Sequence, residues 1–452
     1  MNYKKKIPHK NQNLFVSPIL DKNLIYAPLH GTAILLQNAQ LKNPSPAASN
    51  ALQALLSPPT KAPTTQSGKL VPPFLGILPT RGCNLACAYC GFFSPDQTDK
   101  MSFKVAEQAV RWYLNTLQEA GQTHGEIHFF GGEPFCAPEI VEFVVHLSQK
   151  LAAHLNITLT YAASTNGIYP ADRARWIADH IDSIVLSFDG PEEIQNHHRA
   201  APNEKGSYAI VRRTAEIFSQ HATKFCLRAC ITDETVTSMS QIARWFCQNF
   251  RPDAISFEPL QPSQYSEPAG LYPPDPWSFA QSFIDAAQIV ESYGIEIVYA
   301  TADIDNQRIT FCPVAQDVVI VSPDGRLSAC YLLPEEWQAK GLDLDIGRIH
   351  HDRCQTIEID RIAVERVRQH NVLNKPLCQT CFAKWHCAGG CHVNHQIGTD
   401  YDRLCIQNRI ITLWRILQAM GTSQLAEQWL SDLAEVQKTI LQPSDLLVME
   451  ES

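Results

Sequence analysis

The chain has 452 residues and a formal net charge of −9, and 45% of its residues are hydrophobic. This length allows two or three domains, or one barrel-sized domain with additions. The acidic balance argues against a general nucleic-acid surface, because phosphate binding needs a surplus of Lys and Arg. The sequence shows no apolar run long enough to span a membrane and no signal-peptide pattern. We therefore expect a cytoplasmic protein with neither a nucleic acid nor a membrane as partner.

Residues 1–41 form a small N-terminal segment, and residues 42–73 have the Pro- and Ser-rich composition of a linker. Six apolar runs follow within residues 74–299, separated by amphipathic helical patterns. Such runs are typical of buried parallel strands. The pattern predicts an α/β fold, a partial (β/α)6 TIM-like barrel, with strands that begin near Phe74, Glu126, Thr158, Ser183, Lys224 and Ala254.

The pattern changes after residue 299. Residues 316–333 predict two strands around a Pro-Asp-Gly turn, in which Gly325 tolerates a positive φ. A cysteine-dense, loop-rich stretch completes a second domain at residues 300–412. Helical patterns over 411–441 predict C-terminal helices within residues 413–452.

The chain holds 15 cysteines. Because the cytoplasm is reducing, a disulfide framework is not the first explanation to consider for so many cysteines. Ten cysteines fall into groups, which favours metal ligation. The other five stand alone in apolar or helical surroundings, as buried small side chains do: Cys136, Cys226, Cys230, Cys247 and Cys354.

The first group, Cys83-x3-Cys87-x2-Cys90, directly follows the first predicted strand. Barrels carry their active sites at the carboxyl ends of their strands. Three thiolates can hold three corners of a four-iron, four-sulfur cluster and leave one iron open for a substrate or cofactor. Spacing alone leaves two alternatives, a zinc loop with a distant fourth ligand and plain core cysteines.

This spacing, the aromatic Tyr89 and the "GGEP" of residues 131–134 together resemble the radical S-adenosylmethionine (SAM) enzymes. The resemblance covers about residues 74–260. It implies that the open iron binds SAM, and that one electron from the cluster cleaves SAM to a 5′-deoxyadenosyl radical, which abstracts a substrate hydrogen.

The resemblance also implies the residues that contact SAM. The backbone of the GGEP loop takes the SAM amino group, Tyr89 lies beside the adenine, and the fork of Arg199 suits the SAM carboxylate. For Ser164, Asn166 and Ser187, strand-end capping is an equal alternative. The full set is Tyr89, Gly131, Gly132, Glu133, Pro134, Ser164, Asn166, Ser187, Arg199 and Leu260.

A second cysteine group lies in the C-terminal half. A CxxC with two further cysteines ordinarily suggests zinc, but the order of all seven cysteines resembles the SPASM extension of radical SAM enzymes. That resemblance implies two auxiliary [4Fe–4S] clusters, and so three clusters in all. One takes Cys378, Cys381, Cys387 and Cys405, and the other takes Cys312, Cys330 and Cys391. The second set lacks a fourth ligand, which leaves an open iron or a role for Cys354.

SPASM proteins mostly modify ribosomally made peptides or protein side chains. The leading hypothesis is a peptide maturase, a radical SAM oxidoreductase that forms a thioether or carbon–carbon cross-link, or another oxidation, in a precursor peptide with leader and core. An electron donor such as flavodoxin or ferredoxin is then needed. Residues 23–40 resemble leader-recognising regions that bind a peptide as an added strand, although a packing arm is an alternative.

Two other functions stay open. Anaerobic sulfatase-maturating relatives, which form formylglycine, carry an aspartate where this chain has Tyr331, and that difference disfavours the activity. A non-catalytic iron–sulfur electron carrier or zinc-binding protein is disfavoured by the full set of SAM-site motifs. The catalytic acid or base is not identified, and Glu258 and Tyr331 are the candidates, with Asp189 and His128 also expected near the barrel mouth.

Overall fold

The computed structural model of the chain describes residues 3–5, 13–42, 44–57, 59, 62–92, 98–202, 205–221, 223–263, 265–350, 357–395, 398 and 401–449. The chain divides into two compact units. The first consists of Met1–Thr65, Tyr299–Cys312 and Asn371–Ser452, and the second of Gln66–Val298 and Pro313–His370.

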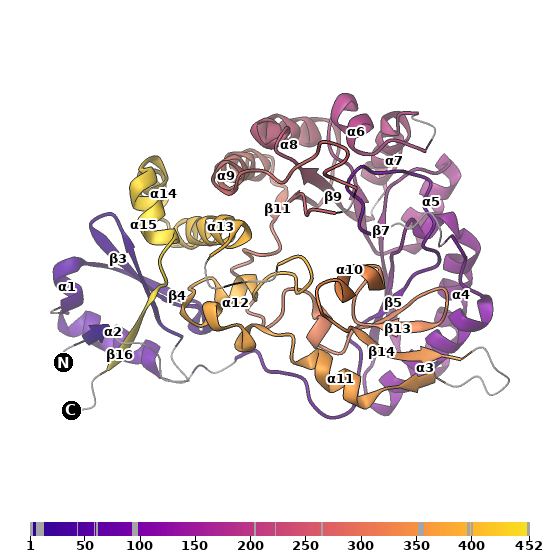
Figure 1. The fold of residues 1–452 in the computed structure, drawn as a ribbon, viewed down its shortest axis with the longest axis horizontal. Coiled ribbons are helices and arrows are strands. Elements are labelled where there is room, and N and C mark those ends of the chain that lie inside the picture. Colours follow the sequence, from indigo (N-terminus) through magenta and orange to yellow (C-terminus); the bar gives the residue numbers. More distant parts are fainter. Residues whose placement is uncertain are drawn as a thin grey trace. The chain divides into compact units, whose positions relative to one another are not determined.

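The second unit is built on a parallel sheet that forms a partial barrel (Figure 1). Each of the six predicted apolar runs is a strand, and strands that follow one another along the chain pair in parallel. A short strand that was not predicted, β11 (Glu296–Val298), extends the sheet beyond the last of them. The six are β5 (Leu75–Ile77), β6 (His124–Phe129), β7 (Thr158–Thr165), β8 (Ser183–Ser187), β9 (Lys224–Ile231) and β10 (Ala254–Pro259).

Helices cover the outer face of this sheet (Figure 1). Strand β9 shows why: Phe225 and Leu227 are buried and Phe225 contacts Phe218 of a covering helix, whereas Cys226 and Arg228 point to the barrel interior. The alternation gives the barrel a polar lining. The helices are α3 (Phe103–Glu119), α4 (Pro138–Leu155), α5 (Ala171–His180), α6 (Glu192–His198), α7 (Tyr208–Gln220), α8 (Met239–Asn249) and α9 (Pro276–Ser292).

The predicted hairpin is confirmed as β12 (Val319–Val321) and β13 (Arg326–Ser328), with Gly325 at φ +80° in the turn. Strand β12 also pairs in parallel with β5, so the hairpin continues the barrel sheet. Strands β14 (Asp345–Ile349) and β15 (Ile357–Ile359) follow it, with helices α10 (Pro334–Gln338) and α11 (Arg361–Arg368). Arg368 donates two hydrogen bonds of 2.8 Å to Asp317, which fixes α11 against the start of β12.

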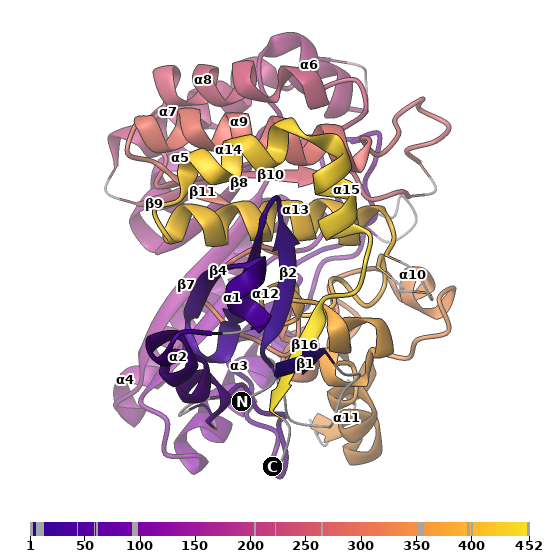
Figure 2. The same cartoon turned by 90° about the vertical axis from the view of Figure 1, so that its left-hand side faces the viewer.

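Among the described residues of the first unit, five strands form an antiparallel sheet in the order β1-β16-β2-β3-β4. Strand β16 (Asp445–Met449) was not predicted and pairs with both β1 (Tyr3–Lys5) and β2 (Phe15–Ile19) (Figure 2). The remaining elements are β3 (Lys22–Ala27), β4 (Thr32–Gln37), α1 (Asn38–Lys42), α2 (Pro46–Leu56), α12 (Lys384–Cys387), α13 (Arg403–Ala419), α14 (Ser423–Ser431) and α15 (Leu433–Ile440).

Helix α2 lies within the stretch of linker composition, yet it contributes to a core. Its Leu52 and Leu55 are buried in one apolar cluster with Val16 of β2, Ile25 of β3 and Leu36 of β4. The hydroxyl of Ser45 caps the helix by accepting a hydrogen bond from the amide of Ala48. Burial of this apolar face therefore holds the helix on the sheet.

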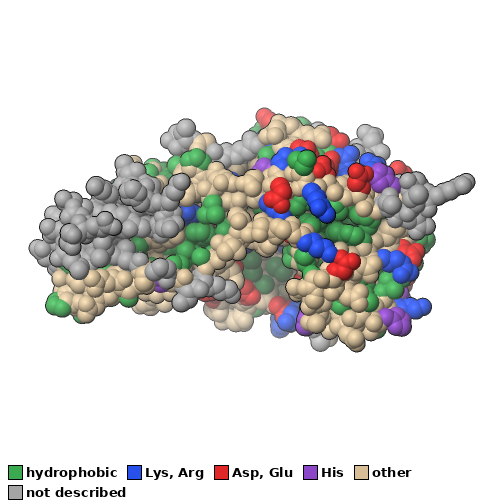
Figure 3. All heavy atoms as spheres, turned by 90° about the horizontal axis from the view of Figure 1, so that it is seen from below, with side chains coloured by type: hydrophobic (Ala, Val, Ile, Leu, Met, Phe, Trp, Pro, Cys, Tyr) green, Lys and Arg blue, Asp and Glu red, His purple; other side chains and the backbone are tan. Residues whose placement is uncertain are grey.

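Figure 3 shows acidic and basic side chains interspersed on the right-hand part of the face that it draws. Lys100 with Glu139 and Arg111 with Glu107 are exposed ion pairs of the second unit. No helix among the described residues is long and apolar enough to cross a membrane.

His386 of α12 joins separate parts of the first unit. Its ring is fully buried, with Nδ1 2.9 Å from the carbonyl oxygen of Asp303 and Nε2 2.5 Å from the hydroxyl of Tyr26. Because a carbonyl oxygen only accepts, Nδ1 carries the proton, and Nε2 accepts from the Tyr26 hydroxyl. Burial outweighs the bond to Asp303 and lowers the pKa of His386 from 6.5 to about 4.

We expect the free energy of unfolding of the first unit to fall as the pH drops below 6.5, because the unfolded state then binds a proton that folded His386 excludes. The loss is about 1.4 kcal/mol per pH unit until the folded pKa is reached. Urea unfolding at pH about 7 and about 5.5 measures it, with His386→Gln as the control that lacks the titrating group. Equal losses in the wild type and the variant would contradict the expectation.

Candidate functional site

The three-cysteine loop follows β5 at the carboxyl end of the strand, where the chain leaves the barrel. Cys83, Cys87 and Cys90 are half-buried. Burial raises the pKa of Cys83, and the neighbouring charges of Glu133, Cys87 and Cys90 raise it further. Burial also raises the pKa of Cys87 to about 12, although Arg199 opposes the shift. Thiolates crowded in this way need added positive charge, which iron supplies.

The GGEP loop packs directly on the cysteine loop. A Cβ on Gly131, whose φ is +138°, would lie 2.4 Å from the carbonyl oxygen of Thr80. A Cβ on Gly132 would lie 2.3 Å from the carbonyl oxygens of both Arg81 and Gly82. The two glycines are therefore needed for this close approach of two backbones. Their contact with the SAM amino group stays a prediction.

We expect Gly132→Ala to lower the free energy of unfolding by about 1–3 kcal/mol and to reduce the iron bound by the cysteine loop, because backbone atoms must move to admit the methyl group. Iron analysis and urea unfolding measure the two effects. Gly91→Ala is the matched control, since its Cβ would meet only a side-chain carbon of Leu332, at 3.5 Å. Similar iron loss in both variants would contradict the role of close packing.

Glu133 ties the GGEP loop to the end of β7. Its buried carboxylate accepts hydrogen bonds from the Asn166 amide at 2.7 Å, the Thr165 hydroxyl at 2.9 Å and the Phe135 amide at 3.1 Å. Burial outweighs these donors and raises the pKa of Glu133 to about 7. Adjacent Pro134 begins a short 3-10 helix, Pro134–Cys136.

Asn166 continues this network toward the cysteines. Its side-chain Nδ2 donates to Oδ1 of Asn84 at 2.8 Å and lies 3.5 Å from Sγ of Cys83. Its Oδ1 accepts from the amide of Ile168 at 2.9 Å, and Asn84 donates to the carbonyl oxygen of Ile168 at 2.7 Å. The structure thus brings together the loops after β5, β6 and β7. Asn166 connects these three loops by hydrogen bonds. Sequence reasoning gave no role to Asn84 or Thr165, which lie within the cysteine loop and the end of β7 but are not themselves motif positions.

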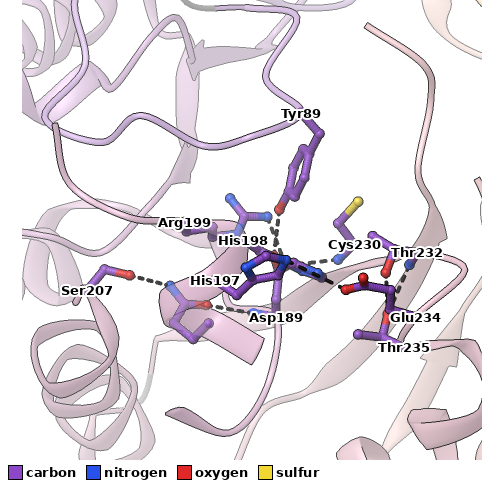
Figure 4. Close-up of polar contacts among 11 residues, drawn as sticks. Tyr89, Asp189, His197, His198, Arg199, Ser207, Cys230, Thr232, Glu234 and Thr235 are labelled. Atoms are coloured by element: carbon purple, nitrogen blue, oxygen red, sulfur yellow. Dashed lines mark hydrogen bonds and ion pairs between the residues drawn. The ribbon is translucent and has the colours of Figure 1, made fainter. Parts of the chain in front are cut away.

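Asp189 organises the loop after β8, and Figure 4 shows the surrounding side chains converging on it. The Tyr89 hydroxyl donates to its carboxylate at 2.6 Å, Arg199 donates at 3.0 Å, His198 Nδ1 lies at 3.2 Å and the Cys230 amide donates at 2.9 Å. Burial opposes ionisation, but Arg199 and His198 outweigh it and hold the pKa of Asp189 below its usual range.

This ion pair sets the position of two predicted SAM residues. The Arg199 guanidinium lies over the ring of Tyr89, 5.4 Å from its centroid. Asp189 therefore fixes Tyr89 and Arg199 together, directly beside Cys87. Sequence reasoning named Asp189 only as a polar residue near the barrel mouth, because its partners come from separate loops.

The remaining predicted residues of the barrel lie at its carboxyl end or lining. Ser164 of β7 and Ser187 of β8 are half-buried, and Leu260 after β10 is fully buried. Glu258 of β10 accepts a hydrogen bond of 3.0 Å from Ser256, and burial raises its pKa although Arg228 opposes the shift. His128 of β6 stacks on Phe74 with ring centroids 4.2 Å apart.

Tyr331 lies directly after Cys330, beyond β13. Its ring packs on Phe130 with centroids 4.6 Å apart. Its carbonyl oxygen accepts a 2.7 Å hydrogen bond from Arg81, which is buried and close to Cys330. Burial lowers the pKa of Arg81 to about 10 against the opposing charge of Cys330. Arg81 thus connects the cysteine loop to the hairpin within the second unit.

The first unit contains a separate cavity among cysteines. Its lining includes the whole set Cys378, Cys381, Cys387 and Cys405, with Lys384, Tyr401, Asn408 and Arg409. The side chain of Arg409 is buried, and its Nε has no hydrogen-bond partner among the described residues. Four thiols and two cations around one cavity fit an anionic iron–sulfur cluster. His395 Nε2 lies 3.5 Å from Sγ of Cys405 and 2.9 Å from Oδ1 of Asp402.

The other predicted set is divided between the units. Cys312 and Cys391 belong to the first unit, whereas Cys330 follows β13 of the second. Each of these three cysteines is half-buried. Cys354 lies outside the described residues.

Residues 77–246 match the radical SAM superfamily. The chain contains a radical SAM domain. Its cofactors are accordingly SAM and a [4Fe–4S] cluster, as the resemblance implied. The matched range runs from β5 into α8 and includes the loops built around Cys83, Glu133 and Asp189.

Three relatives are similar to parts of the chain. The chain is 27% identical to a cysteine-type anaerobic sulfatase-maturating enzyme of Clostridium perfringens. That match covers 45% of this chain and 57% of the relative, so the chain spans little more than half of that protein. It is 25% identical to a serine-type enzyme of Klebsiella aerogenes over 72% of the chain and 80% of that protein. It is 21% identical to the subtilosin biosynthesis protein AlbA of Bacillus subtilis over 72% of the chain and 68% of that protein.

Two solved structures share the fold of the radical SAM chain. The structure of native anSMEcpe with bound AdoMet has a TM-score of 0.61 at 19% identity, and the match covers 77% of this chain and 99% of that one. Streptococcus suis SuiB bound to S-adenosylmethionine has a TM-score of 0.50 at 13% identity, over 85% of this chain and 96% of that one. The partial barrel predicted from the sequence is thereby confirmed.

Proposed function

We propose that this radical SAM enzyme is a peptide maturase that oxidises side chains of a ribosomally made precursor peptide and forms a thioether or carbon–carbon cross-link. The observation that carries the proposal is the three-cysteine loop at the mouth of a barrel with a polar lining. The relatives act on protein substrates or serve peptide biosynthesis, as their names state. We infer the same class of substrate here.

In this proposal Cys83, Cys87 and Cys90 hold the cluster that binds SAM. The chemistry supplied by that group is reductive cleavage of SAM and hydrogen abstraction from the substrate. The residues of the chain position the reacting groups. Glu133 connects the GGEP loop to the end of β7, and Asp189 orients Tyr89 and Arg199.

The acid or base toward the substrate is proposed to be Glu258, whose burial keeps the carboxyl protonated to higher pH than usual. Two auxiliary clusters, bound by Cys378, Cys381, Cys387 and Cys405 and by Cys312, Cys330 and Cys391, complete the proposed cofactors. A flavodoxin or ferredoxin is the proposed electron donor.

A leader peptide is proposed to bind at β4, which ends the order of the first sheet. An edge strand offers backbone donors and acceptors to an added strand. The alternative is that residues 1–41 are only a packing arm. In that case, removal of the leader is expected to leave the affinity of the enzyme for the precursor peptide unchanged.

A second candidate is formylglycine formation in a sulfatase, which the similarity to sulfatase-maturating enzymes favours. The family resemblance implies an aspartate in those relatives where this chain has Tyr331, whose ring packs on Phe130. The similarity to known proteins supports both candidates, and we prefer the peptide maturase because Tyr331 offers no carboxylate as proton acceptor.

Mass spectrometry separates the two candidates. The reduced enzyme is incubated with SAM and either the peptide encoded beside its gene or a sulfatase-derived peptide with Cys or Ser. The proposal expects loss of hydrogen from the precursor peptide and a product that does not react with hydrazide reagents. An aldehyde product from the sulfatase peptide, with the precursor peptide unchanged, would reverse the assignment.

A further inference from the structure

Two neighbouring residues of α13 donate hydrogen bonds to the cysteine sulfurs of the cavity in the first unit. Nδ2 of Asn408 lies 3.3 Å from Sγ of Cys387, and Nη1 of Arg409 lies 3.1 Å from Sγ of Cys381. Asn408 and Arg409 are 2% and 1% exposed, so water does not compete for these donors. Both residues line the same cavity as the four cysteines.

The orientation of Asn408 is fixed by its other contacts. Gln407 donates to the hydroxyl oxygen of Tyr299 at 2.6 Å, so the Tyr299 hydroxyl hydrogen is available for Oδ1 of Asn408, 2.7 Å away. The hydroxyl of Thr301 donates to the same Oδ1 at 2.7 Å. With Oδ1 held by two donors, Nδ2 must face the sulfur of Cys387.

Arg409 is held equally firmly. Its guanidinium lies over the rings of Phe382 and Tyr401, 4.7 Å and 4.2 Å from their centroids. Nη2 donates to the carbonyl oxygens of Gln442 at 2.7 Å and Thr439 at 3.3 Å. None of the hydrogen bonds of Arg409 among the described residues goes to a carboxylate. A buried cation without a partner charge is costly, and thiolate ligands around the cavity supply that charge.

We propose that Asn408 and Arg409 are positioning residues that raise the reduction potential of the auxiliary cluster bound by Cys378, Cys381, Cys387 and Cys405. The inference rests on the proposed function, because it requires that cluster. Reduction adds one negative charge to the cluster. Hydrogen bonds to its sulfurs and a fixed positive charge stabilise the more negative state. The residues therefore favour the reduced form.

A simpler role is open to Arg409 alone, because its bonds to Gln442 and Thr439 anchor the C-terminal stretch on α13. Among the described residues, Asn408 makes no hydrogen bond to that stretch, and its amide is directed to sulfur. The two roles are therefore separated by substituting each residue in turn.

The test is an EPR-monitored redox titration of the full-length, iron-loaded protein with Cys83, Cys87 and Cys90 replaced by Ala, so that only auxiliary clusters contribute. At the midpoint potential of this reference, Asn408→Leu and Arg409→Gln are each expected to lower the ratio of reduced to oxidised cluster at least about tenfold, which corresponds to 59 mV for one electron. Arg409→Lys, which keeps the charge but not the fork, is expected to fall between them and the reference.

The control is Lys384→Met, because Lys384 lines the cavity but donates to Oε1 of Gln379 at 2.7 Å instead of to sulfur. Because it removes a charge but no hydrogen bond to sulfur, it is expected to shift the potential less than Arg409→Gln, which removes both. Unchanged midpoints in Asn408→Leu and Arg409→Gln, with full iron content, would overturn the inference. If Arg409→Gln loses iron, the midpoint potential of Asn408→Leu alone tests the inference. A reference protein with no cluster at these four cysteines would instead refute the proposed cofactor set.

Discussion

Cys83→Ala is expected to abolish formation of 5′-deoxyadenosine by the reduced enzyme. Cys83 is one of three thiols in the loop after β5, and with two ligands left the site no longer holds a four-iron cluster. Bound iron is expected to fall from about twelve to about eight per chain, because the auxiliary cysteines are untouched. Anaerobic reconstitution, iron and sulfide analysis and chromatography of the SAM products measure both effects.

The matched control for this variant is Cys247→Ala. Cys247 is a buried cysteine of α8 outside both cysteine groups. It is expected to retain iron and SAM cleavage. Persistent cleavage in Cys83→Ala, or equal loss in Cys247→Ala, would count against the loop as the site of the chemistry.

Asp189→Asn is expected to lower the free energy of unfolding of the barrel unit by about 3–5 kcal/mol. The reason is that Arg199, whose charge is almost buried, loses its negatively charged partner. The side chain of Asp189 is fully buried and that of Arg199 is 11% exposed. Asn offers one acceptor oxygen where Tyr89, Arg199 and the Cys230 amide donate to two, so Tyr89 is held less firmly and SAM cleavage is expected to fall even at temperatures where the variant is folded.

Urea unfolding compares this variant with Asp253→Asn. Among the described residues, the carboxylate of Asp253 accepts one hydrogen bond, of 2.9 Å, from the Phe225 amide at the opposite end of the barrel. Asn keeps an acceptor there, so a loss of only about 1 kcal/mol is expected. Because the pKa of Asp189 is lowered in the folded state, its contribution is present above the ordinary Asp pKa and is lost as the pH falls below it. Equal stability of the two variants would contradict the role of the buried pair.

The long elements of the barrel could be predicted because each carries a periodic pattern over many residues. Strand β9 alternates buried and exposed side chains over eight residues, and α3 repeats its apolar face over 17. The three-residue strand β11 is too short to show such a period, whereas the equally short β12 could be predicted from the Pro-Asp-Gly turn that follows it. Strand β16 pairs with β2 from the opposite end of the chain, and nothing in the local sequence records that pairing.

The candidate site likewise contains residues that could be predicted from local sequence and residues that could not. The three cysteines of the loop lie within eight residues, so the sequence itself shows them as a group that favours metal ligation. The contacts of Asp189 come from the cysteine loop, the end of α6 and β9, which meet only in the folded barrel. Asn408 and Arg409 belong to no motif, and only the position of α13 brings them to the sulfurs of Cys387 and Cys381.

The loop of Cys83, Cys87 and Cys90 is proposed to hold an iron–sulfur cluster that cleaves SAM. The anaerobic reaction of the reconstituted wild type with SAM and a strong reductant tests this proposal. We expect about twelve irons per chain and release of 5′-deoxyadenosine and methionine. A protein that binds zinc stably, takes up no iron and leaves SAM intact would contradict it.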